Sequence, residues 1–272
     1  QRQMCIRDRL KNILKEVKSV LVAFSGGVDS TFLLKIAKDT LKENVLAVTA
    51  ISPTYPPQEL EEAKKLAKML EVNHIILETN ELENANFVKN GPDRCYWCKR
   101  ELFSKLKEVA KQKKINKVLD ASNLDDTRDF RPGMKALEEL GVISPLKEAG
   151  FTKKEIRTLS RKMGLPTWNK PSLACLSSRF PYGTRIKKEI LEKIAKGETL
   201  LKTLGISQVR ARHHGSIVRI EVLPEEINKI LENREKIVKK FKELGYTYIT
   251  VDIEGYRSGS MNEVLTKTQA SL

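Results

Sequence analysis

Cysteine, histidine and tryptophan are scarce in this sequence of 272 residues, which contains four cysteines, three histidines and two tryptophans. So few cysteines exclude a small disulfide-stabilised scaffold and favour metal binding or catalysis as their use. No apolar run approaches the roughly 20 residues that a membrane-spanning helix needs. The opening residues also contain no apolar segment typical of a secretory signal. We therefore expect a cytoplasmic protein with no membrane partner.

Basic residues outnumber acidic ones, with 50 Lys and Arg against 35 Asp and Glu and a formal net charge of +15. Such a charge raises the question of a nucleic-acid partner. Residues 183–272 hold 17 basic and 12 acidic residues, so a net charge of +5 lies there and +10 in the first 182 residues. Because the excess is spread out and interleaved with Glu, we expect a solvated basic surface and a small anionic substrate such as a nucleotide. A nucleic-acid partner is not expected.

Short apolar runs alternate with helical patterns through the first half of the chain. The predicted strands are the runs 20–24, 44–52, 73–79 and 117–123. The predicted helices between them are 31–42, 56–71 and 101–114. This alternation predicts an α/β fold with a doubly wound parallel sheet that helices cover on both faces. The loops at the carboxyl ends of the strands should then form the binding edge.

A change of pattern indicates two domains. A further helix is predicted over 152–164, and the Pro-, Ser- and Gly-rich segment 165–184 has no clear period. We place the domains at 10–182 and 183–272, and interpret residues 1–9, with Cys5, as a leader foreign to the fold. The smaller α+β domain is expected to serve substrate binding and homo-oligomerisation. Its predicted elements are two helices in 187–204, paired strands in 207–222, one long helix in 225–244 and a strand in 246–253.

The stretch SGGVDS, residues 25–30, joins the first predicted strand to a helix. Its glycines let the backbone approach an anion, and the helix that follows offers free N–H groups. It lacks the Gly-Lys-Ser/Thr of a Walker A loop and the spacing of a dinucleotide fingerprint. Ser-Gly-Gly-x-Asp-Ser resembles the pyrophosphate loop (PP-loop) of the N-type ATP pyrophosphatases, which cleave ATP between the α and β phosphates. The resemblance implies that the pyrophosphate, bridged by Mg²⁺, is bound by Ser25, Gly26, Gly27, Asp29 and Ser30.

Acidic residues also follow the fourth predicted strand, in SNLDDTRDF (122–130), at the same edge of the sheet. We expect Asp29 and Asp126 to help position Mg²⁺, with Asn123 and Asp125 as further candidates for Mg²⁺ or substrate. The same residues also fit an Asx turn and a helix cap, so both interpretations stay open.

Nitrogen-transferring members of this superfamily need a glutaminase domain or an ammonia supply, and no glutaminase domain fits beside two domains in 272 residues. Sulfur-transferring members need cysteines, and the sequence has them, so we expect the sulfur-transferring branch. Stretches such as VAFSGGVDST, RCYWCK, SNLDDTRDFRPG, PSLACLSSRFPYGT and VRARHHGSIVRIEV resemble, in this order, the LarE family. These ATP-dependent sulfur transferases make the nickel-pincer nucleotide cofactor of lactate racemase. The resemblance implies that ATP adenylates a carboxylate of pyridinium-3,5-biscarboxylic acid mononucleotide and that a sulfur nucleophile displaces AMP.

The resemblance also implies that Cys175 is the reactive cysteine, and some family members surrender its sulfur and are left with dehydroalanine. This sequence has Cys95 and Cys98 in addition. We expect the three thiolates to hold a [4Fe-4S] cluster whose fourth iron carries sulfide from an external source. Zinc bound by the three cysteines and a histidine remains open, as does an inert Cys-x-x-Cys beside a sacrificial Cys175.

Two arginines of VRARHHG alternate with apolar residues, so Arg210 and Arg212 should share one face of a strand. Paired guanidinium groups suit the 5′-phosphate of the substrate, as the resemblance also implies, although a polar strand face explains them too. Arg179 is expected to contact the substrate or the pyrophosphate. The stretch 254–263 receives no role. A cluster-dependent tRNA thiolase and a non-enzymatic nucleotide-binding module remain as alternative functions.

Overall fold

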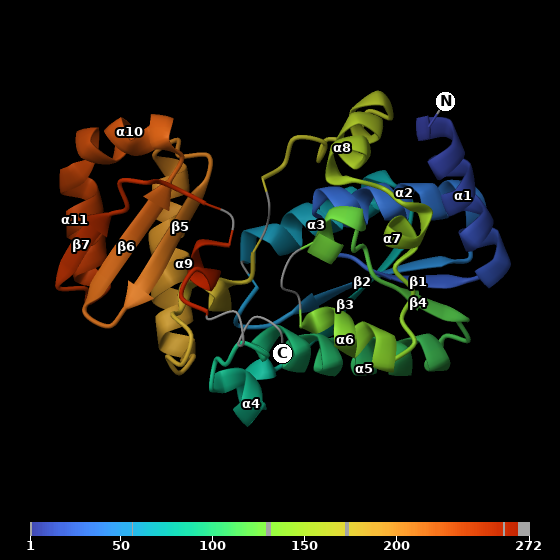
Figure 1. The fold of residues 1–272 in the computed structure, drawn as a ribbon, viewed down its shortest axis with the longest axis horizontal. Coiled ribbons are helices and arrows are strands. Elements are labelled where there is room, and N and C mark those ends of the chain that lie inside the picture. Colours follow the sequence, from blue (N-terminus) through green and yellow to red (C-terminus); the bar gives the residue numbers. More distant parts are fainter. Residues whose placement is uncertain (1, 56, 129–131, 172–173, 258, 266–272) are drawn as a thin grey trace. The chain divides into compact units, whose positions relative to one another are not determined.

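The computed structural model describes residues 2–55, 57–128, 132–171, 174–257 and 259–265 (Figure 1). The chain divides into two compact units. The first consists of Gln1–Ser52, Pro57–Glu81 and Cys95–Leu173, and the second of Pro53–Pro56, Leu82–Arg94 and Ala174–Leu272. The sequence analysis placed a single join near residue 183. The division in space differs from it, because two short segments of the N-terminal half belong to the second unit.

The first unit is built on a parallel sheet with the strand order β3-β2-β1-β4. The strands are β1 (Val20–Ala23), β2 (Val45–Ile51), β3 (Asn73–Glu78) and β4 (Lys117–Leu119). Ile143 adds a parallel bridge to Leu119 at the β4 edge. All four strands therefore end at one edge of the sheet, where the loops that follow them can meet.

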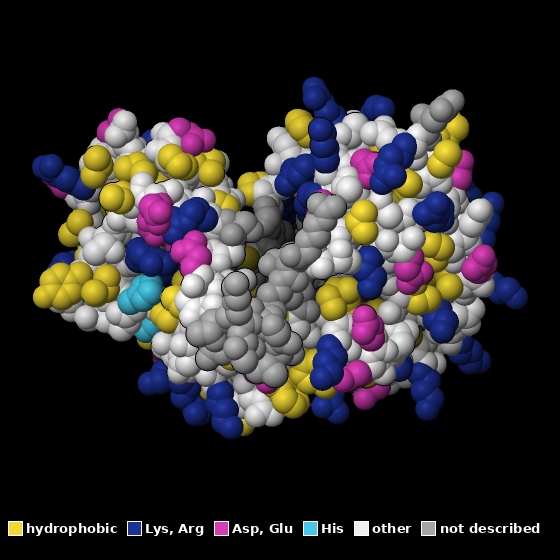
Figure 2. Space-filling view, in the orientation of Figure 1, with side chains coloured by type: hydrophobic (Ala, Val, Ile, Leu, Met, Phe, Trp, Pro, Cys, Tyr) yellow, Lys and Arg dark blue, Asp and Glu magenta, His cyan; other side chains and the backbone are white. Residues whose placement is uncertain are grey.

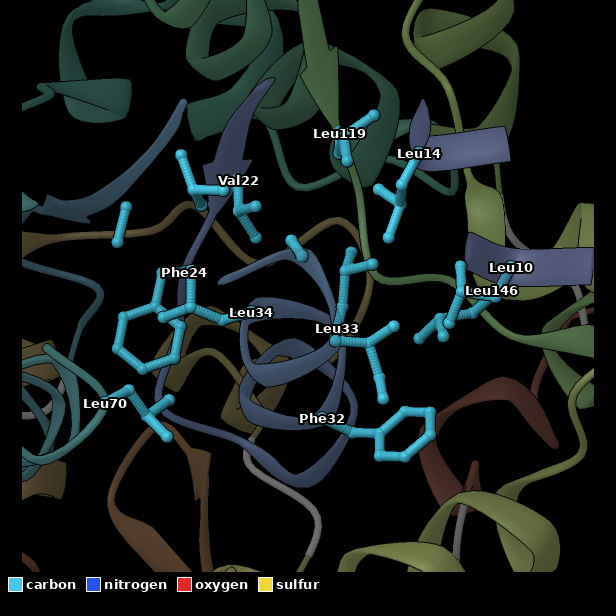
Figure 3. Packing of buried hydrophobic residues seen from close by; sticks show 14 of the residues in the cluster. Leu10, Leu14, Val22, Phe24, Phe32, Leu33, Leu34, Leu70, Leu119 and Leu146 are labelled. Atoms are coloured by element: carbon cyan, nitrogen blue, oxygen red, sulfur yellow. The ribbon is translucent and has the colours of Figure 1, made fainter. Parts of the chain in front are cut away.

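Helices cover both faces of this sheet (Figure 1). They are α1 (Arg2–Val17), α2 (Val28–Leu41), α3 (Pro57–Met69), α5 (Arg94–Gln112), α6 (Gly133–Glu139), α7 (Pro145–Ala149) and α8 (Lys153–Lys162). Along β1, Val20 and Val22 pack with α1, α2, α3, α7 and α8, whereas Leu21 packs with α5 and α6. Figure 3 shows part of the first core, with Val22 and residues of α2. The predicted doubly wound α/β fold is confirmed.

Helix α1 includes residues that the sequence analysis left without structure. It begins at Arg2, and Ile6 is buried in the first core with Leu10 and Leu14. The spacing of four residues places the three side chains on one helix face. The expectation that residues 1–9 lie outside the fold is therefore wrong for residues 2–9, which belong to α1.

The second unit has a three-stranded sheet in the order β5-β6-β7, antiparallel between β5 and β6 and parallel between β6 and β7. Its elements are α4 (Ala85–Val88), the 3-10 turn η3 (Leu176–Arg179), α9 (Lys188–Thr203), β5 (Val209–His214), β6 (Ile217–Val222), the turn η4 (Pro224–Glu226), α10 (Ile227–Glu232), α11 (Arg234–Glu243), β7 (Tyr248–Val251) and the turn η5 (Ser260–Asn262). This sheet with its helices is the small α+β assembly that the sequence predicted.

Two helix predictions in this unit were wrong in number. One helix, α9, replaces the predicted pair. Gly197 lies inside this helix and packs closely against Phe241, since a Cβ at this position would lie 2.5 Å from the Phe241 ring. Conversely, the predicted long helix is broken at Asn233, whose backbone (φ −102°, ψ 16°) ends α10 and precedes α11.

Lys and Arg side chains are scattered over the face seen in Figure 2 and alternate with Asp and Glu. This distribution agrees with a basic surface that is diffuse. Among the described residues, none of the helices combines the length and the apolar character needed to cross a bilayer.

Candidate active site

The loop from Ser25 to Ser30 connects the end of β1 to the start of α2. Gly26 has a positive φ of 69°, and a Cβ on it would lie 3.3 Å from the Cβ of Ala63 in α3. Gly27 precedes the first helical residue in an extended conformation, and no side chain caps its helix end. The N–H groups of the first helical turn and the positive end of the helix dipole therefore face the strand edge, as an anion site requires.

Two hydroxyl groups lie together in this loop. The Oγ atoms of Ser25 and Ser30 are 3.1 Å apart, and the Gly27 N–H donates to Ser25 Oγ at 3.4 Å. Ser30 Oγ also approaches the Gly27 carbonyl oxygen at 3.3 Å. The structure thus brings together the two serines and two glycines that the sequence singled out.

Asp29, in the first turn of α2, contacts residues from two other loops of the same sheet edge. Its carboxylate forms an ion pair with Lys153 at the start of α8 and accepts a hydrogen bond from Asn123 Nδ2 at 3.4 Å. Both carboxylate oxygens are therefore engaged by protein groups. Lys153 was not identified from the sequence, and it places a positive charge beside the loop of residues 25–30.

The loop after β4 is organised by its own polar side chains. Asn123 Oδ1 accepts from the Asp125 N–H at 2.9 Å, and Asp126 Oδ2 accepts from the Asn123 N–H at 2.9 Å. Asp125 Oδ2 also accepts from the backbone N–H of Lys153, the first residue of α8, at 2.7 Å. These are the turn and cap contacts that the sequence analysis gave as the alternative to Mg²⁺ binding. The Mg²⁺ roles of Asp29 and Asp126 stay predictions.

Asp120 is buried directly after β4 and is held as a carboxylate. It accepts hydrogen bonds from the Ser122 N–H at 2.8 Å and Ser144 Oγ at 2.9 Å, and Lys99 Nζ lies 3.4 Å away. Burial alone would raise the pKa of Asp120, but the Lys99 charge and the hydrogen bonds outweigh it and lower this pKa.

Cys95 and Cys98 lie in the first turns of α5, which starts at Arg94 and not near residue 101 as predicted. Residues three apart in a helix are neighbours on one face. Cys98 Sγ lies 3.8 Å from Glu81 Oε1, which also accepts from Ser52 Oγ at 3.1 Å. All four cysteines are free thiols, and thiols suit an iron–sulfur cluster or zinc. Across the described part of the chain, however, no group of three His, Cys, Asp or Glu side chains is arranged to hold a metal ion.

Cys175, in the second unit, is exposed and precedes the turn η3. Its Sγ accepts from the Ser177 N–H at 3.4 Å. The buried Arg179 holds this segment, since its Nη1 donates to the carbonyl oxygens of Ala174 at 3.0 Å and Cys175 at 3.2 Å. Nε and Nη2 of Arg179 bind the two carboxylate oxygens of Glu198 at 2.8 and 2.9 Å. These contacts position the backbone beside Cys175, and contact between Arg179 and a substrate stays a prediction.

Asn90 and Arg94 support the residues after Cys175. Arg94 Nη1 donates to the Ser177 carbonyl oxygen at 3.0 Å. Asn90 Nδ2 donates to the carbonyl oxygens of Pro181 at 2.7 Å and Thr184 at 3.1 Å. Because Leu82–Arg94 belongs to the second unit, these contacts explain how a segment distant in sequence becomes part of it.

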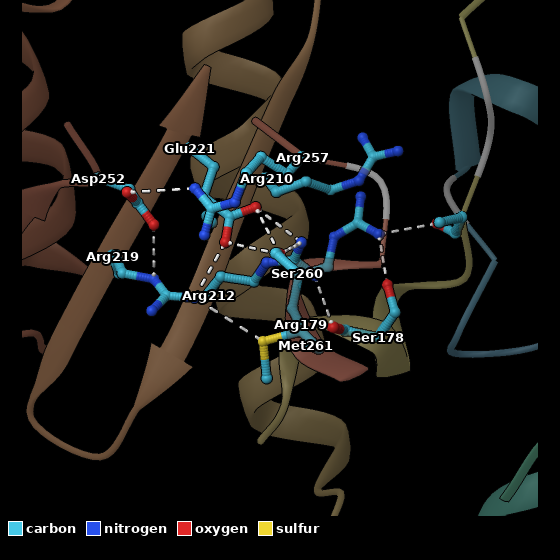
Figure 4. Close-up of polar contacts among 12 residues, drawn as sticks. Ser178, Arg179, Arg210, Arg212, Arg219, Glu221, Asp252, Arg257, Ser260 and Met261 are labelled. Carbon is cyan, nitrogen blue, oxygen red and sulfur yellow. Dashed lines mark hydrogen bonds and ion pairs between the residues drawn. The ribbon is translucent and has the colours of Figure 1, made fainter. Parts of the chain in front are cut away.

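Arginines gather on one face of β5 and β6 (Figure 4). The register places Arg210 opposite Glu221 and Arg212 opposite Arg219, so these four side chains share a face, as predicted for the first pair. Arg212 Nη2 binds the buried Glu221 at 2.7 Å, and Arg219 binds the same carboxylate at 3.0 Å.

The Arg210 guanidinium lies over the Tyr256 ring, 5.2 Å from its centroid. Burial and the nearby charge of Arg179 lower the pKa of Arg210 to about 10, so it remains protonated at neutral pH. Positive charges held this close to one another favour an anion as a ligand.

Sequence analysis missed Lys153, Glu198 and Glu221. Only Glu198 had a recognisable signal, because it lies on the apolar stripe of α9 that contains the buried residues Leu191, Ile194 and Leu201. A carboxylate on such a stripe indicates a buried ion pair. The others become visible only through the contacts that the fold creates.

Comparison with known proteins identifies the family. The NAD synthase family matches residues 2–111. The chain is 43% identical to an uncharacterized protein of Synechocystis sp., over 96% of this chain and 98% of that protein. It is 39% identical to the pyridinium-3,5-bisthiocarboxylic acid mononucleotide synthase of Lactiplantibacillus plantarum, over 94% of this chain and 93% of that protein. With similarity of this degree over nearly the whole of both chains, and with a glycine-containing loop joining strand to helix at the edge of a parallel sheet, the chain belongs to the LarE family of ATP-dependent sulfur transferases, within the PP-loop superfamily.

Proposed function

We propose that this enzyme converts the two carboxylates of pyridinium-3,5-biscarboxylic acid mononucleotide to thiocarboxylates at the expense of ATP. The observation that carries the proposal is the similarity to the Lactiplantibacillus plantarum synthase over both units. In the proposed reaction a carboxylate oxygen attacks the α-phosphorus of ATP and pyrophosphate leaves. Hydrosulfide sulfur then attacks the acyl carbon and AMP leaves. The C–O bond is replaced by a C–S bond, and the sulfur's proton passes to the released pyrophosphate.

The phosphate loop is the proposed site for the ATP phosphates. Its support is the combination of an uncapped helix start after Gly27 with the adjacent hydroxyls of Ser25 and Ser30. Mg²⁺ would enter with ATP, and Asp29 and Asp126 are its proposed contacts. Lys153 adds a charge next to Asp29 that would offset the phosphate charge.

The arginine face of β5 and β6 is the proposed site for the 5′-phosphate of the mononucleotide. Its support is the close grouping of Arg210 and Arg212 with the further positive charges of Arg179 and Arg219. Bidentate contacts from guanidinium groups are well suited to a phosphate. Arg179, whose Nε, Nη1 and Nη2 already donate to protein groups, would contribute through its charge.

Cys175 is the proposed centre of sulfur transfer, because it is exposed and lies on a segment that Arg179 and Arg94 hold in place. A [4Fe-4S] cluster is proposed on Cys95, Cys98 and Cys175, supported by three free thiols of which two share a helix face. Such a cluster would supply a bound sulfide. The alternative is transfer of the Cys175 sulfur itself, which leaves dehydroalanine.

The experiment compares acceptors. Purified protein with ATP, Mg²⁺ and sulfide is given either the pyridinium mononucleotide or unmodified tRNA, and the release of AMP and pyrophosphate is measured with the mass of the acceptor. We expect release and thiocarboxylate formation only with the mononucleotide. Stimulation by tRNA, with sulfur found in the RNA, would support a tRNA thiolase, and ATP binding without turnover in either case would support a binding module.

A further inference from the structure

A lysine from the segment that precedes Cys175 in the sequence reaches the phosphate loop. Lys170 Nζ lies 3.3 Å from the carbonyl oxygen of Gly26, 2.8 Å from Glu59 Oε2 and 2.6 Å from Glu62 Oε2. All four residues belong to the first unit. Lys170 lies in a stretch in which the sequence predicted no regular structure, and it received no role there.

The number of contacts decides what this lysine can do. An ammonium group has three N–H donors, and the three partners of Lys170 account for all of them. Two of the partners are carboxylates, so the charge of Lys170 is already neutralised. A lysine in this state differs from the lysine of a Walker A loop, whose ammonium is directed at the phosphates.

In the loop, Lys170 binds the carbonyl oxygen of Gly26, and the direction of that carbonyl group affects whether the loop can bind an anion. Backbone N–H groups bind an anion only where the neighbouring carbonyl oxygens are turned away from it. Gly26 has the positive φ that such a turn requires, and α3 packs against it closely at Ala63. Lys170 donates to the Gly26 carbonyl oxygen from the side of α3, since Glu59 and Glu62 belong to that helix.

Both the carboxylate of Glu59 and the segment that carries Lys170 are held in place. Glu59 is buried, with 4% of its surface exposed. The segment that carries Lys170 is held by Arg157 of α8, which donates to the carbonyl oxygens of Trp168 and Lys170, both at 2.8 Å. Burial alone would lower the pKa of Lys170, but the hydrogen bonds that its ammonium donates to Glu59 and Glu62, and the charges of these carboxylates, outweigh burial and raise this pKa, so the ammonium is present throughout the neutral range.

We propose that Lys170 is a positioning residue that holds the Gly26 carbonyl group away from the bound phosphates and so sets the loop for ATP. The inference rests on the proposed role of the loop in binding the ATP phosphates. Lys170 itself does not contact ATP in this proposal. Its loss should therefore weaken the binding of phosphate groups without changing the binding of the nucleoside.

The test uses the full chain and two probes, inorganic pyrophosphate and adenosine, with binding measured by calorimetry. The double variant Lys170→Met with Glu59→Gln removes the ammonium without leaving a buried carboxylate unpaired. We expect it to bind pyrophosphate about tenfold more weakly, the worth of roughly one hydrogen bond, with adenosine affinity unchanged. Lys64→Met is the matched control, because Lys64 pairs with Glu61 on the exposed side of the same helix.

A second variant provides the test if the double variant does not fold. Lys170→Arg keeps a charge next to Glu59 but replaces three tetrahedral donors with a planar group, and it should also lose pyrophosphate affinity selectively. Unchanged pyrophosphate affinity in the folded variants, or equal losses for both probes, would overturn the positioning role alone. A wild-type protein that binds pyrophosphate but makes no thiocarboxylate would instead contradict the proposed function alone. A wild-type protein that does not bind pyrophosphate would contradict both.

Discussion

Glu198 and Arg179 form a two-pronged ion pair inside the second unit, with N–O distances of 2.8 and 2.9 Å, and the same arginine binds the carbonyl oxygen of Cys175. Glu198 also accepts from the Ala211 N–H of β5 at 2.9 Å. One buried carboxylate therefore links the Cys175 segment, α9 and the arginine-bearing strand. The position of the proposed reactive cysteine and that of the proposed phosphate site depend on the same residue.

Replacing Glu198 with alanine should lower the free energy of unfolding by about 3 kcal/mol, because it leaves the buried Arg179 without its partner. Urea denaturation measures this change. Glu192→Ala is the control, since Glu192 lies on the exposed side of the same helix and surface substitutions cost less than about 0.5 kcal/mol. A loss for Glu198→Ala as small as that of the control would show that the pair does not hold this segment.

The Gly26→Ala variant should lose most ATP-dependent pyrophosphate release. An alanine at φ 69° is strained by about 1 kcal/mol, and its Cβ would press on Ala63 and shift the loop. Gly141→Ala carries a similar backbone strain, but a Cβ there meets nothing within 4 Å, so it should be destabilised by that strain alone and stay fully active. Equal activities in the two variants would remove the phosphate role from the loop.

Replacing Arg210 or Arg212 with alanine should raise the KM for the mononucleotide about thirtyfold, because a charge-assisted contact to phosphate is worth roughly 2 kcal/mol. The KM for ATP should change little. Steady-state kinetics with each substrate varied in turn measure both values. The exposed Arg234, replaced with alanine, serves as the control. An equal rise in both KM values would assign the arginines to the ATP site instead.

Acid should destabilise the protein in part through Asp120. Its folded pKa is lowered from the ordinary 3.8, so its stabilising effect is present above that pH and is lost as the pH falls through the folded pKa. Asp120→Asn should therefore make the free energy of unfolding depend less on pH below about 4. Asp39→Asn, which alters an exposed carboxylate, is the control. An unchanged pH dependence in Asp120→Asn would mean that this carboxylate has an ordinary pKa.

The sequence predicted the parallel sheet and its flanking helices because alternating apolar runs and helical periods are local signals. The motif SGGVDS identified the loop in the same way, and the alternation in β5 placed Arg210 and Arg212 on one face. The Cys-x-x-Cys helix was predicted to begin too late because Arg94–Arg100 has no regular apolar period. The contacts of Lys153 and Lys170 join residues far apart in the chain, and no local pattern encodes such contacts.

Turnover with sulfide most directly tests the central claim, that ATP-dependent sulfur transfer to the mononucleotide requires Cys175. Protein prepared without oxygen, with its iron and acid-labile sulfide measured, is given ATP, Mg²⁺, sulfide and the mononucleotide. The thiocarboxylate formed per chain and the intact mass of the chain are then determined. The account predicts several thiocarboxylates per chain, an unchanged mass, and loss of both iron and turnover in each of Cys95→Ala, Cys98→Ala and Cys175→Ala. A single transfer with dehydroalanine at Cys175 would contradict the cluster, and thiocarboxylate formation by Cys175→Ala would contradict the central claim.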